Sequence, residues 1–261
     1  MTVGDFRPIS FCNVLYKIIA KLIVQWLSVT LDKLICPCQA AFVLGRSIGD
    51  NIMLAQELFT GYNQVRLPPR CALKVHIRKA YNMVEWDFLI AVMELFGFPH
   101  TFEKWIEACI KTPSFFVRLN GKPHGFFRGA RGLRQGDPLL LYLFILVMKV
   151  LHLGFLQLID QDELFSFHWK CNTARIFQLG FVDDLLLLCR ADMDSIGVFK
   201  TGLDRFAEWS GHRLNVQKSH LIISRSAQGL REEMLAVIGF QEGVLSEVPG
   251  VTAIIFLIND C

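Results

Sequence analysis

Two adjacent carboxylates, Asp183 and Asp184, interrupt an otherwise apolar stretch that runs from Ile176 to Cys189. The apolar runs on both sides have the length of strands, so they predict two buried strands that meet at the carboxylate pair. Neighbouring carboxylates repel each other, and apolar surroundings raise the cost of their charges. A divalent cation such as Mg²⁺ takes carboxylate oxygens and offsets that repulsion. The pattern indicates either an ordinary polar turn or a metal site, and these residues alone leave both open.

The composition indicates a folded intracellular protein. Apolar residues make up 52% of the 261 residues and charged residues 20%, with a formal net charge of +3. Disordered chains have the opposite balance, and a charge this small does not identify a nucleic-acid-binding protein. Eight cysteines are too few for a disulfide scaffold of this length, and Cys36-Pro37-Cys38 is too tightly spaced for half of a zinc site. We therefore expect reduced thiols and an intracellular location, either nuclear or cytoplasmic.

The longest apolar tract, Pro138 to Ile159, has the length of a membrane span. Lys149 falls near its middle, where a charge costs about 2.5–3.5 kcal/mol even on insertion scales. Gly136-Asp137-Pro138 in front of the tract is a turn and helix-start signal. The tract therefore favours a buried helix over a membrane span, and we expect no membrane partner.

The order of the remaining elements predicts an α+β fold. Helical spacing favours helices over 16–31, 47–62, 79–96, 102–110, 138–153 and 197–209. Strands are expected over 71–77 and 222–226, and Asn120-Gly121 between Phe115–Leu119 and Phe126-Phe127 predicts a hairpin.

Five blocks, read together and in order, resemble the reverse transcriptase domain of LINE-type non-LTR retrotransposons, most closely those of plants. The blocks are DFRPIS at 5–10, QAAFVLGRS at 39–47, KVHIRKAYNMVEWD at 74–87, GLRQGDP at 132–138 and FVDDL at 181–185. The resemblance implies a right-hand polymerase with fingers and palm, whose thumb is absent or incomplete here. Residues 1–70 would form partial fingers and 71–226 the palm with a fingers insertion, followed by a degraded or frameshifted tail at 227–261.

By the same resemblance, the activity is RNA-directed DNA synthesis, with Mg²⁺ (Mn²⁺ as an alternative) and deoxynucleoside triphosphates on an RNA template and a DNA primer. Asp183 and Asp184 are similar to the paired palm carboxylates that hold two ions, and Lys218 to the palm lysine that protonates pyrophosphate. Tyr81 resembles the residue that excludes a 2′-hydroxyl.

Three further residues resemble nucleotide contacts of the family. Arg46 resembles a fingers contact to the triphosphate, and Gln135 and Gly136 resemble the segment along the incoming nucleotide. Each assignment has a plain structural alternative: core packing for Tyr81, and solvent exposure for Arg46 and Lys218. Asp137 before Pro138 has the pattern of a helix N-cap, and we expect that role for it.

This chain departs from the family pattern at the residues that matter most for catalysis. His76 stands where the pattern has the first palm Asp, and Asn82 replaces a second acid. Imidazole is a neutral, softer ligand that suits Zn or Fe better than Mg²⁺. We therefore expect catalysis to be impaired or lost. Leu44, Leu140, Leu141 and Lys149 also depart from the pattern, and the segment resembling a primer grip is missing from the tail.

These observations leave four hypotheses open. The chain is an active polymerase domain, a non-catalytic nucleic-acid-binding remnant of a retrotransposon, a decayed fragment without function, or a protein with a new metal site made by His76, Asp183 and Asp184. The third palm ligand would then be an imidazole in place of a carboxylate.

Overall fold

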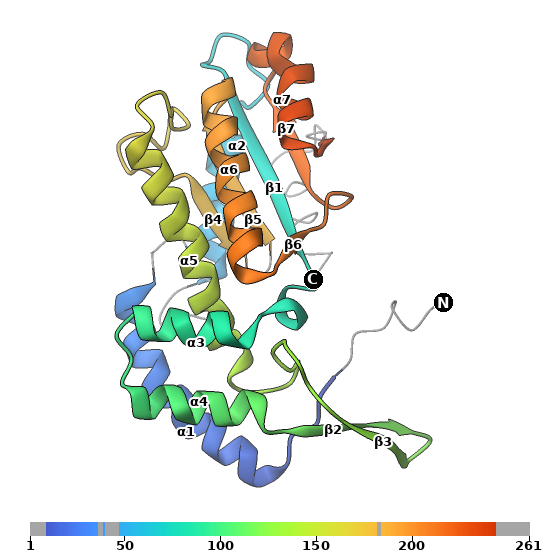
Figure 1. Cartoon of the computed structure of the whole chain (residues 1–261). Helices are drawn as coiled ribbons and strands as arrows, with labels where there is room; N and C mark the ends of the chain where they lie inside the picture. Colours follow the sequence, from blue (N-terminus) through green and yellow to red (C-terminus); the bar gives the residue numbers. More distant parts are fainter. Residues whose placement is uncertain (1–8, 36–38, 40–46, 182–183, 244–261) are drawn as a thin grey trace. The chain divides into compact units, whose positions relative to one another are not determined.

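The computed structural model describes residues 9–35, 39, 47–181 and 184–243 (Figure 1). The chain forms two compact units, each built from separate stretches of sequence. One unit, here called the helical unit, comprises residues 1–34, 79–150 and 209–212. The other, the sheet unit, comprises residues 35–78, 151–208 and 213–261.

The sheet unit is organised around strand β1 (Arg70–Arg78), which the sequence predicts as 71–77. Its sheet has the strand order β4-β5-β1-β7-β8, with β6 also paired to β1. The other strands are β4 (Gln178–Phe181), β5 (Asp184–Arg190), β6 (Arg213–Leu214), β7 (His220–Ile223) and β8 (Gln241–Glu242). β1 pairs antiparallel with β5, β6 and β7, so it is flanked on both edges. Residues 70–75 of β1 are all buried, which agrees with the predicted strand-like run.

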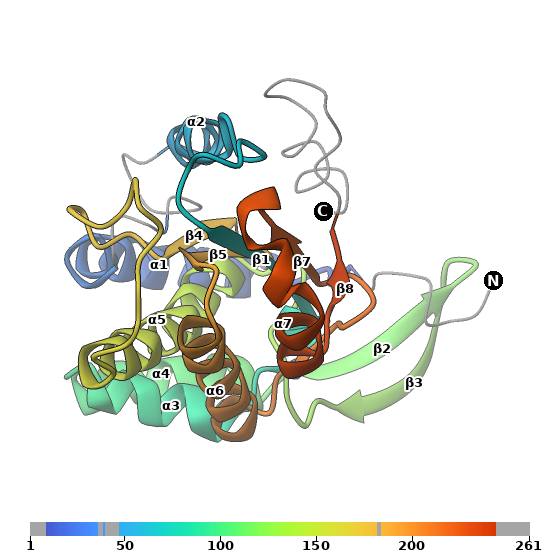
Figure 2. The ribbon, with the colours of Figure 1, turned by 90° about the horizontal axis from the view of Figure 1, so that it is seen from above.

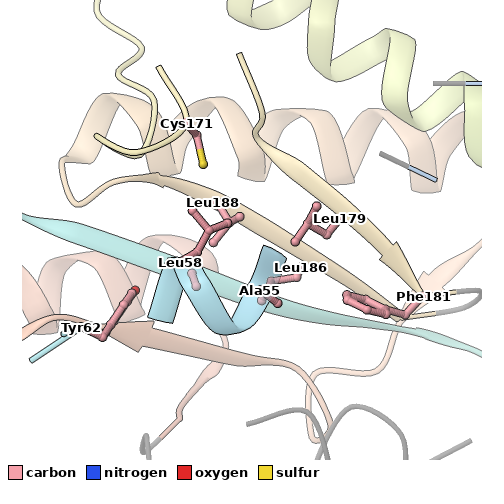
Figure 3. Packing of buried hydrophobic residues seen from close by; sticks show 9 residues of the cluster. Ala55, Leu58, Tyr62, Cys171, Leu179, Phe181, Leu186 and Leu188 are labelled. Atoms are coloured by element: carbon pink, nitrogen blue, oxygen red, sulfur yellow. The ribbon is translucent and has the colours of Figure 1, made fainter. Parts of the chain in front are cut away.

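Helices α2 (Ile48–Phe59) and α6 (Met193–Ser210) lie on opposite faces of this sheet (Figure 2). One cluster of the core joins Ala55, Leu58 and Tyr62 to the side chains of β4 and β5 (Figure 3). Leu186 and Leu188 of β5 belong to it because alternate residues of a strand share a face. The two apolar runs beside the carboxylate pair are therefore core strands, as predicted.

Helix α5 (Leu140–Gln161) extends beyond the predicted residues 138–153. Its C-terminal part belongs to the sheet unit, where the buried ring of Phe155 contacts Phe177 and Phe199 edge to face. A Cβ atom on Gly202 of α6 would lie 2.4 Å from the Phe155 ring, so only glycine allows this close helix approach.

Two described helices are long and apolar enough to cross a membrane, judged by length and composition alone. They are α1 (Val14–Leu34), through its window Val14–Leu31, and α5. In α5, 56% of the window is buried within the protein, which agrees with the predicted buried helix. In α1 only 22% is buried, so this helix presents an apolar surface that the sequence pattern did not single out.

The helical unit contains α1, the short 3₁₀ helix η2 (Ala80–Met83), α3 (Trp86–Leu95), α4 (His100–Lys111) and the hairpin of β2 (Ser114–Leu119) and β3 (Lys122–Arg128). The hairpin and α4 confirm the predictions. The predicted single helix over 79–96 is wrong, because η2 and α3 are separate. Gly132 N donates to Val84 O and Leu133 N donates to Tyr81 O, and these bonds hold the intervening backbone out of a helix.

The prediction of a strand over 222–226 is also wrong in its extent. β7 ends at Ile223, and Ser224 turns the chain into the 3₁₀ helix η3 (Arg225–Leu230). Ser224 N donates to Arg70 O while Arg70 N donates to Ser224 Oγ, so the turn is bonded to the start of β1. Helix α7 (Arg231–Ile238) follows within the predicted tail, and residues 244–261 lie outside the described residues.

Candidate active site

The candidate site lies where the C-terminal end of β1 meets the N-terminal end of β5. The antiparallel register pairs His76 directly with Asp184, one residue beyond the apolar pair Val75 and Leu185. Asp183 lies outside the described residues, so only one member of the carboxylate pair can be placed. The sequence therefore brings an acid and an imidazole from 108 residues apart onto neighbouring strands.

Asp184 is a buried carboxylate with unequal oxygens. Its exposed fraction is 1%, and Oδ1 lies 2.7 Å from His76 Nδ1. Oδ2 is buried and has no hydrogen-bond partner among the described residues. A carboxylate oxygen left in this state costs free energy unless a donor or a cation satisfies it. Asp184 Oδ2 therefore has the chemistry of a ligand to a hard cation.

His76 does not complete a site for two Mg²⁺ ions. It offers a ring nitrogen, a softer ligand than a carboxylate oxygen, at a position that faces Asp184, and its Nδ1 is already in contact with that carboxylate. In the part of the chain that the structure describes, no three His, Cys, Asp or Glu side chains gather closely enough to hold a metal ion. Among the described residues of this site, Asp184 therefore offers an oxygen suited to a hard cation, and His76 offers a nitrogen in place of a second carboxylate.

The turn that contains Lys218 is bonded to the other side of His76. His76 N donates to Ser219 Oγ at 3.0 Å, and His76 O accepts from Asn215 N at 2.9 Å. Lys218 N closes the turn by donating to Asn215 O. The backbone of Lys218 thus lies next to the end of β1, with an exposed side chain. Sequence reasoning assigned no role to Ser219 or Asn215, which carry no motif of their own.

Gly180 lies on β4, opposite Leu185 of β5. Asn51 Nδ2 donates to Gly180 O at 3.1 Å, and Gln39 forms a bridge with the same residue. A Cβ atom at Gly180 would lie 1.8 Å from Gln39 Oε1, so glycine makes room for that side chain. Gln39 and Asn51 therefore flank the strand that leads to the carboxylate pair. Arg46, between them in sequence, lies outside the described residues.

The helical unit holds Tyr81, Gln135 and Gly136. Tyr81 in η2 packs edge to face on Phe144 of α5, with ring centroids 4.9 Å apart. Its ring is partly exposed, so it packs against the core without being enclosed by it. Asn82 and Gln135 line the same small cavity of about 160 Å³, together with Trp86 and Ile110.

The turn at Gln135 and Gly136 is hydrogen-bonded to Ser10, in the segment before α1. Ser10 N donates to Gln135 O at 2.8 Å. Gly136 has φ +95°, and a Cβ atom there would lie 2.7 Å from Ser10 O. Both the backbone conformation and the close approach therefore require glycine at this position.

Asp137 anchors this turn to α1 and to α4. Its Oδ1 accepts from Leu139 N at 3.0 Å, as expected of a residue that caps the start of α5. Its Oδ2 accepts from Tyr16 hydroxyl at 2.6 Å and from Arg134, which also donates to Cys109 O. Burial raises the pKa of Tyr16 well above its usual range, and its hydrogen bond to Asp137 raises this pKa further. The tyrosine therefore remains a neutral donor.

We expect Tyr16→Phe to lower the free energy of unfolding by about 1–2 kcal/mol, because the charged Asp137 loses one of its donors. Urea unfolding monitored by circular dichroism measures this change. Tyr142→Phe, at a partly exposed tyrosine, is the control and should change stability by less than about 0.5 kcal/mol. Equal stability of the Tyr16→Phe protein and the unmodified chain would show that the Tyr16 bond contributes nothing.

Comparison with known proteins gives a consistent result. Residues 2–241 match the family model described as reverse transcriptase (RNA-dependent DNA polymerase). The chain is 26% identical over 224 residues to the transposon TX1 uncharacterized 149 kDa protein of Xenopus laevis, covering 86% of this chain and 17% of that protein. It is 24% identical over 245 residues to the Pol polyprotein of the type-2 retrotransposable element R2DM of Drosophila melanogaster, covering 94% of this chain and 22% of that protein.

Among solved structures, a telomerase from Candida tropicalis in complex with a fragment of telomeric RNA has a similar fold. Its TM-score is 0.55 at 13% identity, covering 77% of this chain and 33% of the telomerase. This likeness concerns the fold alone. It agrees with the predicted α+β polymerase fold, of which this chain represents a part. The chain spans less than a quarter of the length of the two transposon proteins named above.

Proposed function

The chain belongs to the reverse transcriptase (RNA-dependent DNA polymerase) family, and we propose that it is the fingers and palm of a LINE-type, plant-like element whose catalysis is impaired. The observation that carries this proposal is the pairing of Asp184 with His76 at the end of the central strands. Asp184 supplies a buried carboxylate oxygen suited to a cation, and His76 stands where the family pattern has an acid.

The family uses divalent metal ions, and in phosphoryl transfer such ions neutralise charge that develops on the phosphate oxygens. In this chain Asp184, with Asp183 beside it in sequence, would hold Mg²⁺ or Mn²⁺. His76 adds no negative charge, and its contact occupies one oxygen of Asp184. The expected result is weak ion binding and slow chemistry, since transition-state charge is left poorly compensated.

The remaining residues are proposed to act on the nucleotide and the primer-template. The partly exposed ring of Tyr81 would discriminate against a 2′-hydroxyl on the nucleotide. The turn at Gln135 and Gly136 would lie along the incoming nucleotide. Arg46 would contact the triphosphate, and Lys218 would donate a proton to pyrophosphate. The hydrogen bond from Ser10 N to Gln135 O supports a positioning role for this turn, because a segment that positions a ligand must itself be held by its surroundings.

The proposed organisation is partial fingers at 1–70, a palm with a fingers insertion at 71–226 and a degraded or frameshifted tail at 227–261. Its partners would be an RNA template, a DNA primer and deoxynucleoside triphosphates inside the cell. A nucleic-acid-binding remnant without catalysis is the second candidate, and the His76–Asp184 contact favours it because that contact occupies one of the two oxygens with which Asp184 could bind a metal ion.

Primer extension on a polyribonucleotide template separates the two candidates. The proposal predicts a slow extension with Mn²⁺ or Mg²⁺ that disappears in Asp184→Asn. The remnant predicts binding of the primer-template with no product above the Asp184→Asn background. Extension at equal rates in the unmodified chain and in Asp184→Asn would contradict the assignment of Asp184.

A further inference from the structure

The β2–β3 hairpin presents an exposed surface, and none of the proposed catalytic or nucleotide-binding residues lies on it. Every residue of β3 is exposed, and the Phe116 and Phe126 side chains are 50% and 78% exposed. The two strands form a sheet of their own that pairs with no other described strand. In both views the hairpin extends away from α3 and α4 of its own unit (Figures 1 and 2).

Two facing pairs of phenylalanine rings line this hairpin. Phe116 and Phe126 have ring centroids 5.5 Å apart, and Phe115 and Phe127 are stacked at 5.7 Å. Adjacent residues of a strand point to opposite faces, so the two pairs belong to opposite faces of the ribbon. Phe115 is the less exposed ring of its strand and lies close to Gly129, as Trp86 does. Phe116 and Phe126 are therefore the pair in which both rings are exposed, whereas in the other pair only Phe127 is, at 52%.

Positively charged side chains lie at both ends of the hairpin, and no acidic side chain lies between them in sequence. The sequence from Pro113 to Gly136 contains no Asp or Glu. Arg118 and Lys122 lie beside the turn, and Arg128 pairs with Ser114 at the base. None of the three forms an ion pair with a described carboxylate, whereas Arg131 and Arg134, just beyond the hairpin, bind Glu85 and Asp137. These three positive charges are exposed and lie within about 17 Å along the ribbon, from Lys122, paired with Leu119, to Arg128, paired with Ser114.

We propose that the face of Phe116 and Phe126 binds single-stranded nucleic acid, as an extension of the proposed polymerase function on which this inference rests. Exposed aromatic rings stack with unpaired bases of any sequence, and flanking cations contact the phosphates. A duplex hides its base faces, so the single-stranded part of a template is the fitting partner. A membrane surface is disfavoured, because interfacial binding uses a helix with one broad apolar face, whereas the exposed rings of this ribbon, Phe116, Phe126 and Phe127, are divided between two faces.

Fluorescence anisotropy with a labelled single-stranded 20-mer, made as RNA, as DNA and as an abasic backbone, tests the proposal with the full chain. Phe116→Ala/Phe126→Ala should weaken binding of the RNA about 10-fold or more and leave binding of the abasic strand unchanged. Arg118→Gln/Lys122→Gln/Arg128→Gln should weaken binding of every strand. It should also make the slope of log K against log salt shallower by about 2, since each phosphate contact contributes about 0.7.

The matched controls are Val65→Ala/Leu95→Ala, at apolar side chains 69% and 75% exposed, and Arg66→Gln/Lys104→Gln/Arg205→Gln at exposed cations. Both controls should bind like the unmodified chain. If the hairpin variants also bind RNA like the unmodified chain, the proposal is overturned while nucleic-acid binding by the protein stands. If the unmodified chain binds no strand, the proposed function fails together with it. If the full chain binds anionic lipid vesicles more strongly than RNA, and does so through this hairpin, the surface is assigned to a membrane and the proposal is overturned.

Discussion

His76→Asp is expected to accelerate RNA-templated primer extension by about 100-fold to 1,000-fold over the unmodified chain. The substitution places a second carboxylate beside Asp184 at the paired position of β1 and β5. It adds one negative charge to the proposed metal site, and it removes the imidazole that contacts Asp184 Oδ1. Effects of two to three orders of magnitude are typical when one group that stabilises transition-state charge is gained or lost. Single-turnover extension of a labelled primer with Mn²⁺ measures the change.

Two further variants separate the added charge from the removed ring. His76→Asn removes the imidazole without adding a charge, and we expect it to gain less than about 10-fold. The double variant His76→Asp/Asp184→Asn should return to background, because the gain requires both carboxylates. If His76→Asp and His76→Asn extend primers equally fast, loss of the family carboxylate is not the defect in this chain.

Gly136→Ala is expected to destabilise the helical unit by about 2–5 kcal/mol. A left-handed backbone costs about 1–2 kcal/mol once a Cβ atom is present. The Cβ atom would also lie 2.7 Å from Ser10 O, a backbone atom that cannot move aside like a flexible side chain. Relieving this overlap costs a further 1–3 kcal/mol or so and separates Ser10 from Gln135. Urea unfolding monitored by tryptophan fluorescence measures the loss.

Gly97→Ala is the matched control for that measurement. Gly97 has φ +76°, but a Cβ atom there would meet nothing within 4 Å. It should therefore show the backbone cost alone, and the difference between the two variants isolates the contact with Ser10. Equal losses in both variants would mean that the Ser10 segment does not hold the turn.

The core strands could be predicted because a buried strand consists of apolar residues that follow one another in the sequence. In β5 every residue from Asp184 to Cys189 is buried, so both faces of the strand require apolar side chains, and Leu185 to Cys189 form an unbroken apolar run. The carboxylate at the start of β5 stands out against that run, which explains why Asp184 was identified. The helix starting near Pro138 was marked by Asp137, whose capping bond the structure contains.

Contacts between distant segments were not predictable in the same way. Tyr16 and Asp137 are 121 residues apart, and Asn51 and Gly180 are 129 residues apart. No spacing rule connects such residues. The break between η2 and α3 has the same origin, since the bonds from Gly132 and Leu133 come from another part of the chain and override local helical preference.

The pairing of His76 with Asp184 also required the register of the sheet. The sequence marked His76 as a departure from a family pattern, but a shift of one residue would have placed the ring on the opposite face. In the observed register, the imidazole at this position contacts Asp184, the member of the carboxylate pair that the structure describes.

Binding of Mn²⁺, measured by electron paramagnetic resonance in the presence of a deoxynucleoside triphosphate and primer-template, tests the central claim most directly. The unmodified chain is predicted to bind one ion weakly, through Asp184. His76→Asp is predicted to bind two ions, with at least about 10-fold higher affinity for the first. Two ions bound by the unmodified chain, with affinities equal to those of His76→Asp, would contradict the account of a palm disabled at His76.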